Sequence, residues 1–203
     1  SDKNKRLNVL YTHDPLLHHG IIQQCKNRGY DVLLMDKVID NHFIQHLEYK
    51  AEMSFKRIDS DTVDRLIDLD EKPESVLNED QQKSVTELFK QLSVNSASNT
   101  EVKALSPNDP PIQIVRPEFL RRMSEMQHMM HIARGEQDDM FKDSHTVIIN
   151  SNHPVIAQKL VTISEDSSRQ ELATYLMELA LLEQQMLKGA ALTDFVKRSM
   201  EKI

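Results

Sequence analysis

The segment from Leu172 to Leu187 limits the possible folds of this chain more than any other. On a helical wheel with about 100° per residue, its apolar side chains cover an arc of about 260°. A helix at the surface of a globular protein needs an apolar stripe of only about 100° or slightly more. We therefore expect this helix to bury two faces, one against its own domain and one against another helix or a second chain.

The end of the sequence supplies a suitable partner for the second face. We expect a helix over residues 167–188, stopped by Gly189, and a last helix over residues 193–203, capped by Thr193. Apolar side chains recur at helical spacing in the last helix, at Phe195, Val196, Met200 and Ile203. Two such helices at the end of a chain suit a four-helix bundle in a dimer, and they also suit a buried hairpin in a monomer.

The first third of the chain alternates between short apolar strands and helices. Residues 7–11 and 31–35 have the pattern of strands, and the helix between them should end at Gly29. Strand, helix and strand within about 30 residues form a βαβ unit, so the two strands should be parallel with a right-handed crossover. A helix over residues 40–50 and a strand over residues 54–59 complete a small three-layer αβα unit. The inner face of that second helix should carry Phe43, Ile44 and Leu47.

A dense run of charged and polar residues around Pro73 predicts a domain boundary, with a first domain over 1–68 and a second over 69–203. In the second domain we expect helices from Pro73 to about residue 92, from Pro117 to Arg134, and from about Pro154 onward. Strands are expected at residues 101–106, 112–115 and 145–150. The predicted class is α+β: a small αβα three-layer unit with a short parallel sheet, followed by a mixed α/β domain that ends in the helical pair.

Composition excludes several classes of partner. The net charge is −7 and no basic stripe is longer than residues 3–6, so we expect no nucleic-acid partner. No apolar run approaches the roughly 20 residues of a membrane span, and the N-terminus lacks the apolar core of a signal peptide, so we expect no membrane partner. The single cysteine, Cys25, cannot form an internal disulfide, which agrees with a reducing, cytoplasmic setting.

Little in the sequence resembles a catalytic or metal site. The four glycines lie too far apart for the Gly-rich loops that cradle nucleotide phosphates. Two histidine pairs have spacings that can place both imidazoles on one helical face: His42 with His46, and His128 with His131. No third ligand is apparent for either pair, and HExxH is absent. Cys25 lies on the apolar face of its helix without an activating base. We expect no catalytic residue, no metal and no cofactor.

Residues 121–134 hold four of the chain's ten methionines: Met123, Met126, Met129 and Met130. On a wheel, Phe119 joins Met123, Met126 and Met130 in a stripe about 80° wide. Methionine is unbranched and polarizable, so it can repack against partners of many shapes. The stripe therefore predicts either a surface that binds varied partners or ordinary packing into the core of its own domain.

One alternative belongs to another class of protein. Residues 29–36, GYDVLLMD, resemble the phosphoacceptor strand of two-component receiver domains, with Asp36 as the acceptor. A receiver also requires an acidic pair after the first strand, five strand–helix repeats and a late lysine, whereas the pattern here stops after three strands. The alternative function is a receiver-like signalling domain joined to a helical dimerizer.

Four phrases occur in a characteristic order. They are LNVLYTHDPLLHHGIIQQCKNRGYDVLLMDKVIDNHFIQHLE (7–48), PPIQIV followed by EFLRRMSEM (110–126), VIIN followed by SNHPVI (147–156), and the closing leucine-rich helix with its short last helix. Together they resemble the heat-shock-protein-ninety family of molecular chaperones in its bacterial form. The first phrase is similar to the small αβα subdomain that ends the family's middle domain, and the others are similar to its C-terminal dimerization domain.

This resemblance implies a homodimeric, ATP-driven chaperone that binds partly folded client proteins. It assigns client binding to an exposed amphipathic helix, through Phe119, Met123, Met126, Met129 and Met130. It assigns the dimer interface to the two closing helices, through Leu172, Leu176, Leu179, Leu182, Met186, Phe195, Val196 and Met200. ATP and magnesium belong to the family's N-terminal domain, which we expect this chain to lack, so it should neither bind nor hydrolyse ATP.

Overall fold

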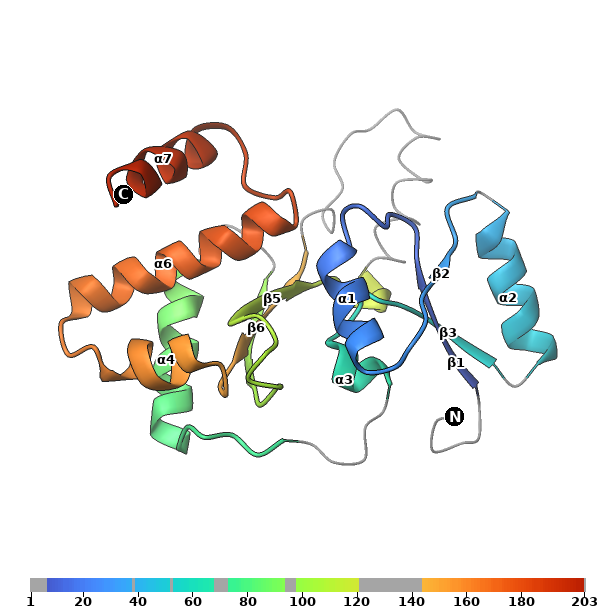
Figure 1. The fold of residues 1–203 in the computed structure, drawn as a ribbon, viewed down its shortest axis with the longest axis horizontal. Helices are drawn as coiled ribbons and strands as arrows, with labels where there is room; N and C mark the ends of the chain where they lie inside the picture. Colours follow the sequence, from blue (N-terminus) through green and yellow to red (C-terminus); the bar gives the residue numbers. More distant parts are fainter. Residues whose placement is uncertain are drawn as a thin grey trace. The chain divides into compact units, whose positions relative to one another are not determined.

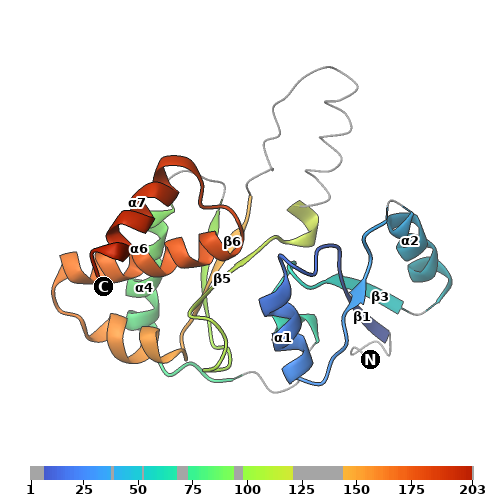
Figure 2. The ribbon, with the colours of Figure 1, turned by 45° about the horizontal axis from the view of Figure 1, so that its top comes forward.

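The computed structural model describes six stretches of the chain: residues 7–37, 39–51, 53–67, 73–93, 98–120 and 144–202. The chain divides into two compact units, one made of residues 1–72 with 115–142 and the other of residues 73–114 with 143–203. Figures 1 and 2 show the helices and strands of both units from two directions. Among the described residues, no helix is long and apolar enough to cross a membrane.

The first unit contains a parallel three-stranded sheet in the order β2-β1-β3, built from β1 (Leu7–Thr12), β2 (Leu33–Leu34) and β3 (Met53–Arg57). In this sheet Tyr11 pairs with Leu33, so the predicted parallel pairing of the first two strands is confirmed. β2 is shorter than the predicted strand 31–35, and both of its leucines are exposed. The reason is that β2 lies at the edge of the sheet and has a neighbour on one side only.

Helices cover both faces of this sheet. α1 (His19–Asn27) and the short α3 (Val63–Leu66) lie on one face, and α2 (Asp40–Lys50) lies on the other (Figure 1). The first face buries a cluster centred on Leu10, Cys25, Ile58, Val63 and Leu66. The second face buries Tyr11, Ile44 and Phe55. The predicted αβα arrangement is therefore present in the described residues.

Two predictions about these helices, one for Gly29 and one for Phe43, can be compared with the structure. Gly29 has a φ of +79°, a left-handed conformation that glycine adopts readily, and it follows the end of α1 as predicted. Phe43 does not lie on the inner face of α2 as predicted, because its side chain is 50% exposed. Ile44 and Leu47 form that face instead.

The second unit contains a three-stranded sheet in the order β4-β6-β5, built from β4 (Asn99–Lys103), β5 (Ile112–Val115) and β6 (Thr146–Asn150). β4 pairs with β6 in parallel, with Glu101 opposite Ile148. All five residues of the central strand β6 are buried. Such a strand contributes side chains to both sides of the sheet, which explains its continuous apolar run.

Helices α4 (Glu79–Leu92) and α6 (Asp166–Glu183) pack on the core of this unit, and α7 (Gly189–Met200) runs beside α6 (Figure 2). Between β6 and α6 the chain forms a π-helical turn, η1 (Val155–Lys159), and a 3-10 turn, η2 (Leu160–Thr162), where one regular helix was expected. The fully buried members of the core include Val85, Phe89, Val147, Ile149, Ile156, Leu160 and Ala173. The α+β class is confirmed for the described residues.

The start of α4 differs from its prediction. The helix begins at Glu79 and not at Pro73, because Asn78 forms a capping box with Gln81. The Gln81 amide donates to Asn78 Oδ1 at 2.9 Å, and the Asn78 amide donates to Gln81 Oε1 at 3.1 Å. These bonds satisfy two backbone donors that a helix start would otherwise leave unpaired.

The turn between the last two helices also differs from its prediction. α6 ends at Glu183, and Gly189 is the first residue of α7, so it does not stop the preceding helix. Gln185 makes the turn with a φ of +55°. Thr193 lies inside α7, where its hydroxyl donates to the Gly189 carbonyl at 3.2 Å, and it does not cap the helix.

Candidate functional site

The closing helices α6 and α7 meet through an aromatic contact. The rings of Tyr175 and Phe195 stack with their centroids 5.4 Å apart and their planes 27° from parallel. Phe195 is buried, and the Lys202 ammonium lies 4.8 Å from the centroid of the Tyr175 ring. Stacking and the cation–π contact both depend on close approach, so they hold the last helix at a defined position along α6.

Ion pairs reinforce this contact on one side of the helical pair. Arg198 donates to Glu178 with 2.5 Å between Nη2 and Oε1, and Lys202 Nζ lies 2.9 Å from Glu171 Oε1. The hydrogen bond to Glu178 raises the pKa of Arg198. These four charged residues line a hollow of about 400 Å³ together with polar residues of α6. This side of the pair is therefore polar.

Another side of the pair is apolar and uncovered. Leu179 and Leu182 of α6 are 40% and 38% exposed, and Val196 and Met200 of α7 are 43% and 70% exposed. Within each helix the two residues are three or four positions apart, so they share one helical face. α6 also buries Ala173, Leu176, Met177 and Ala180 toward its own core. The structure therefore gives α6 two apolar faces, one buried and one partly exposed.

The eight residues predicted for a dimer interface fall into two sets. Four are exposed on the uncovered face: Leu179, Leu182, Val196 and Met200. The other four pack within this chain: Leu172, Leu176 and Met186 against the core, and Phe195 against Tyr175. Contact with a second copy stays a prediction for all eight.

The predicted client-binding residues are only partly within the described part of the chain. Phe119 lies in the helical residues 118–120, and its side chain is 70% exposed. Met123, Met126, Met129 and Met130 lie outside the described residues. Phe119 therefore does not pack into the core, and its contact with a client stays a prediction.

Sequence reasoning missed a buried polar cluster in the first unit. Thr12 Oγ1 lies 2.8 Å from His18 Nδ1, and His18 Nε2 lies 3.7 Å from Asp59 Oδ2. Asp59 also binds Arg57 through both carboxylate oxygens, at 2.5 and 2.6 Å. Burial lowers the pKa of His18, and the nearby Asp59 carboxylate opposes that effect. Hydroxyl, imidazole and carboxylate stand in the order of a catalytic triad.

Burial decides against catalysis by this cluster. Thr12, His18 and Asp59 are 2%, 1% and 4% exposed, so a substrate cannot reach the hydroxyl. The cluster instead connects separate segments, because the Asp59 carbonyl also accepts a hydrogen bond from the Arg116 amide at 2.9 Å. No spacing in the sequence indicates that residues 18 and 59 meet.

The structure gives no metal-binding or catalytic arrangement to the remaining candidates that lie within the described residues. Within the described stretches, no three or more side chains of His, Cys, Asp or Glu are grouped to hold a metal. His42 and His46 lie on α2, whereas His128 and His131 fall outside the described residues. Cys25 is fully buried, and burial raises the pKa of its thiol to about 11, so it is unreactive. Asp36, the phosphoacceptor in the receiver alternative, accepts a hydrogen bond from Lys37 Nζ at 3.1 Å.

An αβα unit followed by a domain that ends in a helical pair with an uncovered apolar face defines an α+β protein. Comparison with known proteins gives its family. Residues 11–202 match the family described as Hsp90 protein, so the chain belongs to the Hsp90 family. The resemblance found in the sequence is thereby confirmed, and the receiver alternative gains no support.

The related proteins are chaperones named HtpG. The chaperone protein htpG of Bacteroides fragilis strain 638R is 28% identical over 272 residues, which cover 100% of this chain and 39% of that protein. The chaperone protein HtpG of Porphyromonas gingivalis strain ATCC 33277 is 29% identical over 195 residues, which cover 92% of this chain and 28% of that protein. The chain thus spans less than half the length of these relatives.

Proposed function

We propose that this chain is the dimerizing, client-contacting part of an HtpG-type molecular chaperone. The observation that carries the proposal is the uncovered apolar face of α6 and α7, formed by Leu179, Leu182, Val196 and Met200. Membership of the Hsp90 family and the likeness to HtpG chaperones support the same function.

In the proposed dimer, α6 and α7 of two copies form a four-helix bundle around a twofold axis. A twofold interface uses the same patch on both chains, so each exposed side chain counts twice. Complete burial of a leucine, valine or methionine side chain stabilises by about 1.5–3 kcal/mol. The four residues are already partly covered, but the eight copies together still provide a substantial driving force for association.

Sedimentation equilibrium tests the dimer directly. The wild-type chain should sediment as a dimer, and the double variant Leu182→Glu/Val196→Glu should sediment as a monomer with unchanged circular dichroism. Gln170→Glu/Ala191→Glu adds the same charge at exposed positions of the same helices and should remain dimeric. A monomeric wild-type chain across the accessible concentration range would overturn the proposed interface.

The client surface is proposed to begin at Phe119 and to continue through the methionines of residues 123–130. An exposed aromatic ring followed by flexible methionine side chains can accommodate apolar segments of different shapes. We further propose that this chain by itself does not hydrolyse ATP. Magnesium-dependent phosphate release by the purified chain, above a heat-treated control, would contradict that part.

A further inference from the structure

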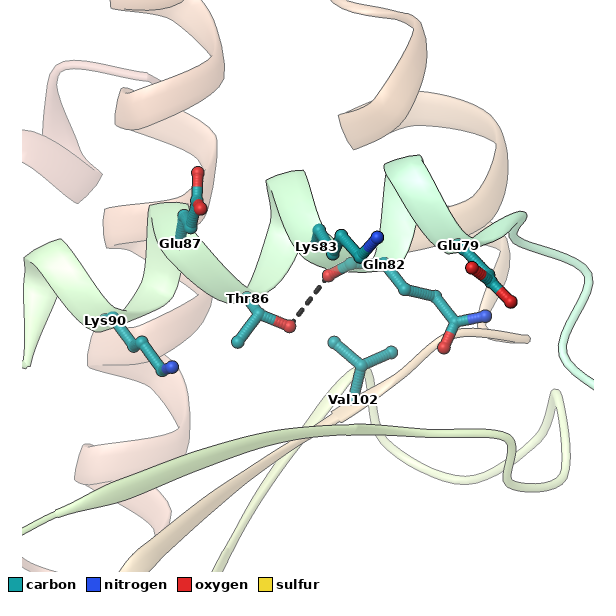
Figure 3. Close-up of a pocket in the computed structure, with 7 residues that line it drawn as sticks. All are labelled: Glu79, Gln82, Lys83, Thr86, Glu87, Lys90 and Val102. Atoms are coloured by element: carbon teal, nitrogen blue, oxygen red, sulfur yellow. Dashed lines mark hydrogen bonds between the residues drawn. The ribbon is translucent and has the colours of Figure 1, made fainter.

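A hollow of about 370 Å³ lies beside α4, between this helix and Val102 of β4 (Figure 3). Its charged lining residues are two acids, Glu79 and Glu87, and two bases, Lys83 and Lys90. Because these charges balance, the hollow favours neither an anionic nor a cationic ligand. The polar residues that bear on function lie instead in the first unit.

A buried aspartate of the first unit is bonded to the start of the segment that carries Phe119. The Asp59 side chain is only 6% exposed, and Arg57 donates to both of its carboxylate oxygens, at 2.5 and 2.6 Å. A bidentate contact of this kind fixes the geometry of both side chains as well as pairing their charges. The Asp59 side chain is therefore held in one position, just after the end of β3.

The backbone of Asp59 is fixed by the turn that follows β3. The Ser60 amide donates to the Arg57 carbonyl at 3.0 Å, and Ser60 Oγ donates to the same carbonyl at 2.6 Å. The Asp59 carbonyl and the Ser60 amide belong to one planar trans peptide group, so they point in opposite directions. The hydrogen bond of the amide therefore also fixes the direction of the carbonyl.

The fixed carbonyl holds the backbone that leads to Phe119. It accepts a hydrogen bond from the Arg116 amide at 2.9 Å, and both residues belong to the first compact unit. The next residue is Pro117, whose ring fixes its own φ near about −65° and restricts the backbone of the residue before it. Helical residues follow the proline directly. Little conformational freedom therefore remains between the anchored amide of Arg116 and Phe119.

We propose that Arg57 and Asp59 are positioning residues for the client surface, which they hold in place through the backbone of Arg116. This inference rests on the proposed function, because that function assigns Phe119 to the client surface. A surface that is already held in place loses less conformational entropy when a partner binds. The Arg57–Asp59 pair thus contributes to client binding although its side chains are buried and do not touch the client.

The same unit contains a second aspartate–arginine pair, which serves as a matched control. Arg28 donates from Nε to Asp64 Oδ1 at 2.7 Å, and the two side chains are 18% and 13% exposed. This pair joins the end of α1 to α3. Within the described part of the chain, Asp64 forms no hydrogen bond with residues 116–120. Asp59→Asn and Asp64→Asn therefore remove the same charge from two ion pairs, and only the first pair is connected to Phe119.

The mobility of residue 119 gives the first readout. The 203-residue chain has no tryptophan, so Phe119→Trp introduces a single fluorophore at this position. Time-resolved fluorescence anisotropy of that variant measures the nanosecond motion of residue 119. An asparagine amide nitrogen cannot accept a hydrogen bond from Arg57, so adding Asp59→Asn should lower the residual anisotropy. Adding Asp64→Asn should leave the anisotropy unchanged.

Client affinity gives the second readout. Isothermal titration calorimetry measures the binding of reduced carboxymethylated lactalbumin to Asp59→Asn, to Phe119→Ser and to the combined variant. Asp59→Asn should weaken binding by about threefold or more, whereas Asp64→Asn should change it by less than about twofold. Phe119→Ser should weaken binding less in the presence of Asp59→Asn than in its absence, because two changes that act through one surface are not additive.

Circular dichroism establishes that each variant is folded. If Asp59→Asn does not fold, Arg57→Lys takes its place in both measurements, because lysine keeps the charge but lacks the paired donors of arginine. Unchanged anisotropy would overturn the proposal, and so would additive effects on client affinity or equal effects of Asp59→Asn and Asp64→Asn. If Phe119→Ser leaves client affinity unchanged while Asp59→Asn lowers the anisotropy, the proposed client surface fails and the anchoring of residue 119 does not.

Discussion

Phe195 of α7 stacks on Tyr175 of α6 with 5.4 Å between ring centroids, and it is the one residue of α7 that is buried among those described. Phe195 is therefore the main buried contact of the last helix, beside the ion pairs that Arg198 and Lys202 form with α6. Two other apolar residues of α7, Val196 and Met200, are exposed. The aromatic contact that helps to attach α7 therefore also positions the exposed residues of the proposed dimer interface.

Replacing Phe195 by Ala should detach α7 and weaken the dimer together. Truncation of a buried phenylalanine usually costs about 3–5 kcal/mol of unfolding free energy. We expect a loss near the lower end of that range, because part of α7 can separate without unfolding the core. Chemical denaturation and sedimentation equilibrium measure the two effects. Val196→Ala, at the exposed neighbour, should leave monomer stability within about 0.5 kcal/mol of wild type.

A buried asparagine holds the loop between β4 and β5. Asn150 is fully buried, and its Oδ1 accepts from the amides of Leu105 at 3.2 Å and Asn152 at 3.0 Å. Its Nδ2 donates to the carbonyls of Ser106 at 2.8 Å and Asp109 at 3.3 Å. One side chain therefore satisfies four backbone groups.

Replacing Asn150 by Ala should lower the free energy of unfolding by at least about 2 kcal/mol. The reason is that each buried backbone group left without a partner costs about 1–3 kcal/mol. Urea denaturation followed by circular dichroism measures the change. Asn108→Ala, at an exposed position of the same loop, serves as the control and should change stability little. A small loss in Asn150→Ala would mean that water replaces the amide.

The buried imidazole of His18 should make stability depend on pH. Its pKa is lowered in the folded state from the ordinary value of 6.5, chiefly because burial disfavours the charged form. The unfolded chain therefore binds this proton more readily than the folded chain. Stability is complete above the unfolded pKa and falls as the pH drops through 6.5 toward the lower folded pKa.

Denaturation at pH 7.5 and at pH 5.5 measures this effect. The wild-type chain should lose stability on acidification, and His18→Gln should lose less, although its stability at pH 7.5 will be lower. Some dependence should remain, because burial also lowers the pKa of His153. His46→Gln, at an exposed residue of α2, should behave like wild type. Identical pH slopes for wild type and His18→Gln would exclude the imidazole as the source.

The sequence predicted those features that depend on neighbours along the chain. The βαβ spacing predicted the parallel pairing of Tyr11 with Leu33, and Gly29 was correctly identified as the end of α1. The same rule failed at Gly189. The turn after α6 is made by Gln185 in a left-handed conformation, and glutamine has no preference for that conformation that would reveal the turn in the sequence. Helix ends set by glycine alone are therefore ambiguous when two helices follow closely.

Features that depend on distant residues were beyond sequence reasoning. The wide apolar arc showed that α6 needs two partners, but it did not separate the buried Leu176 from the exposed Leu179 and Leu182. All are leucines, and only the position of the sheet and of α7 distinguishes them. The contact between His18 and Asp59 joins residues far apart in the sequence, so the local spacing of residues does not predict it.

The reading of the methionine stripe can be decided at Phe119. Its side chain is 70% exposed, so Phe119→Ser should change the free energy of unfolding by less than about 0.5 kcal/mol. If the stripe is a client surface, the variant should bind an unfolded model protein, such as reduced carboxymethylated lactalbumin, about three- to tenfold more weakly. Loss of an apolar contact of about 0.7–1.4 kcal/mol has that effect. Isothermal titration calorimetry measures the affinity, and Tyr49→Ser, at an 89% exposed aromatic residue of α2, is the matched control. Equal affinities for Phe119→Ser, Tyr49→Ser and wild type would remove Phe119 from the client surface.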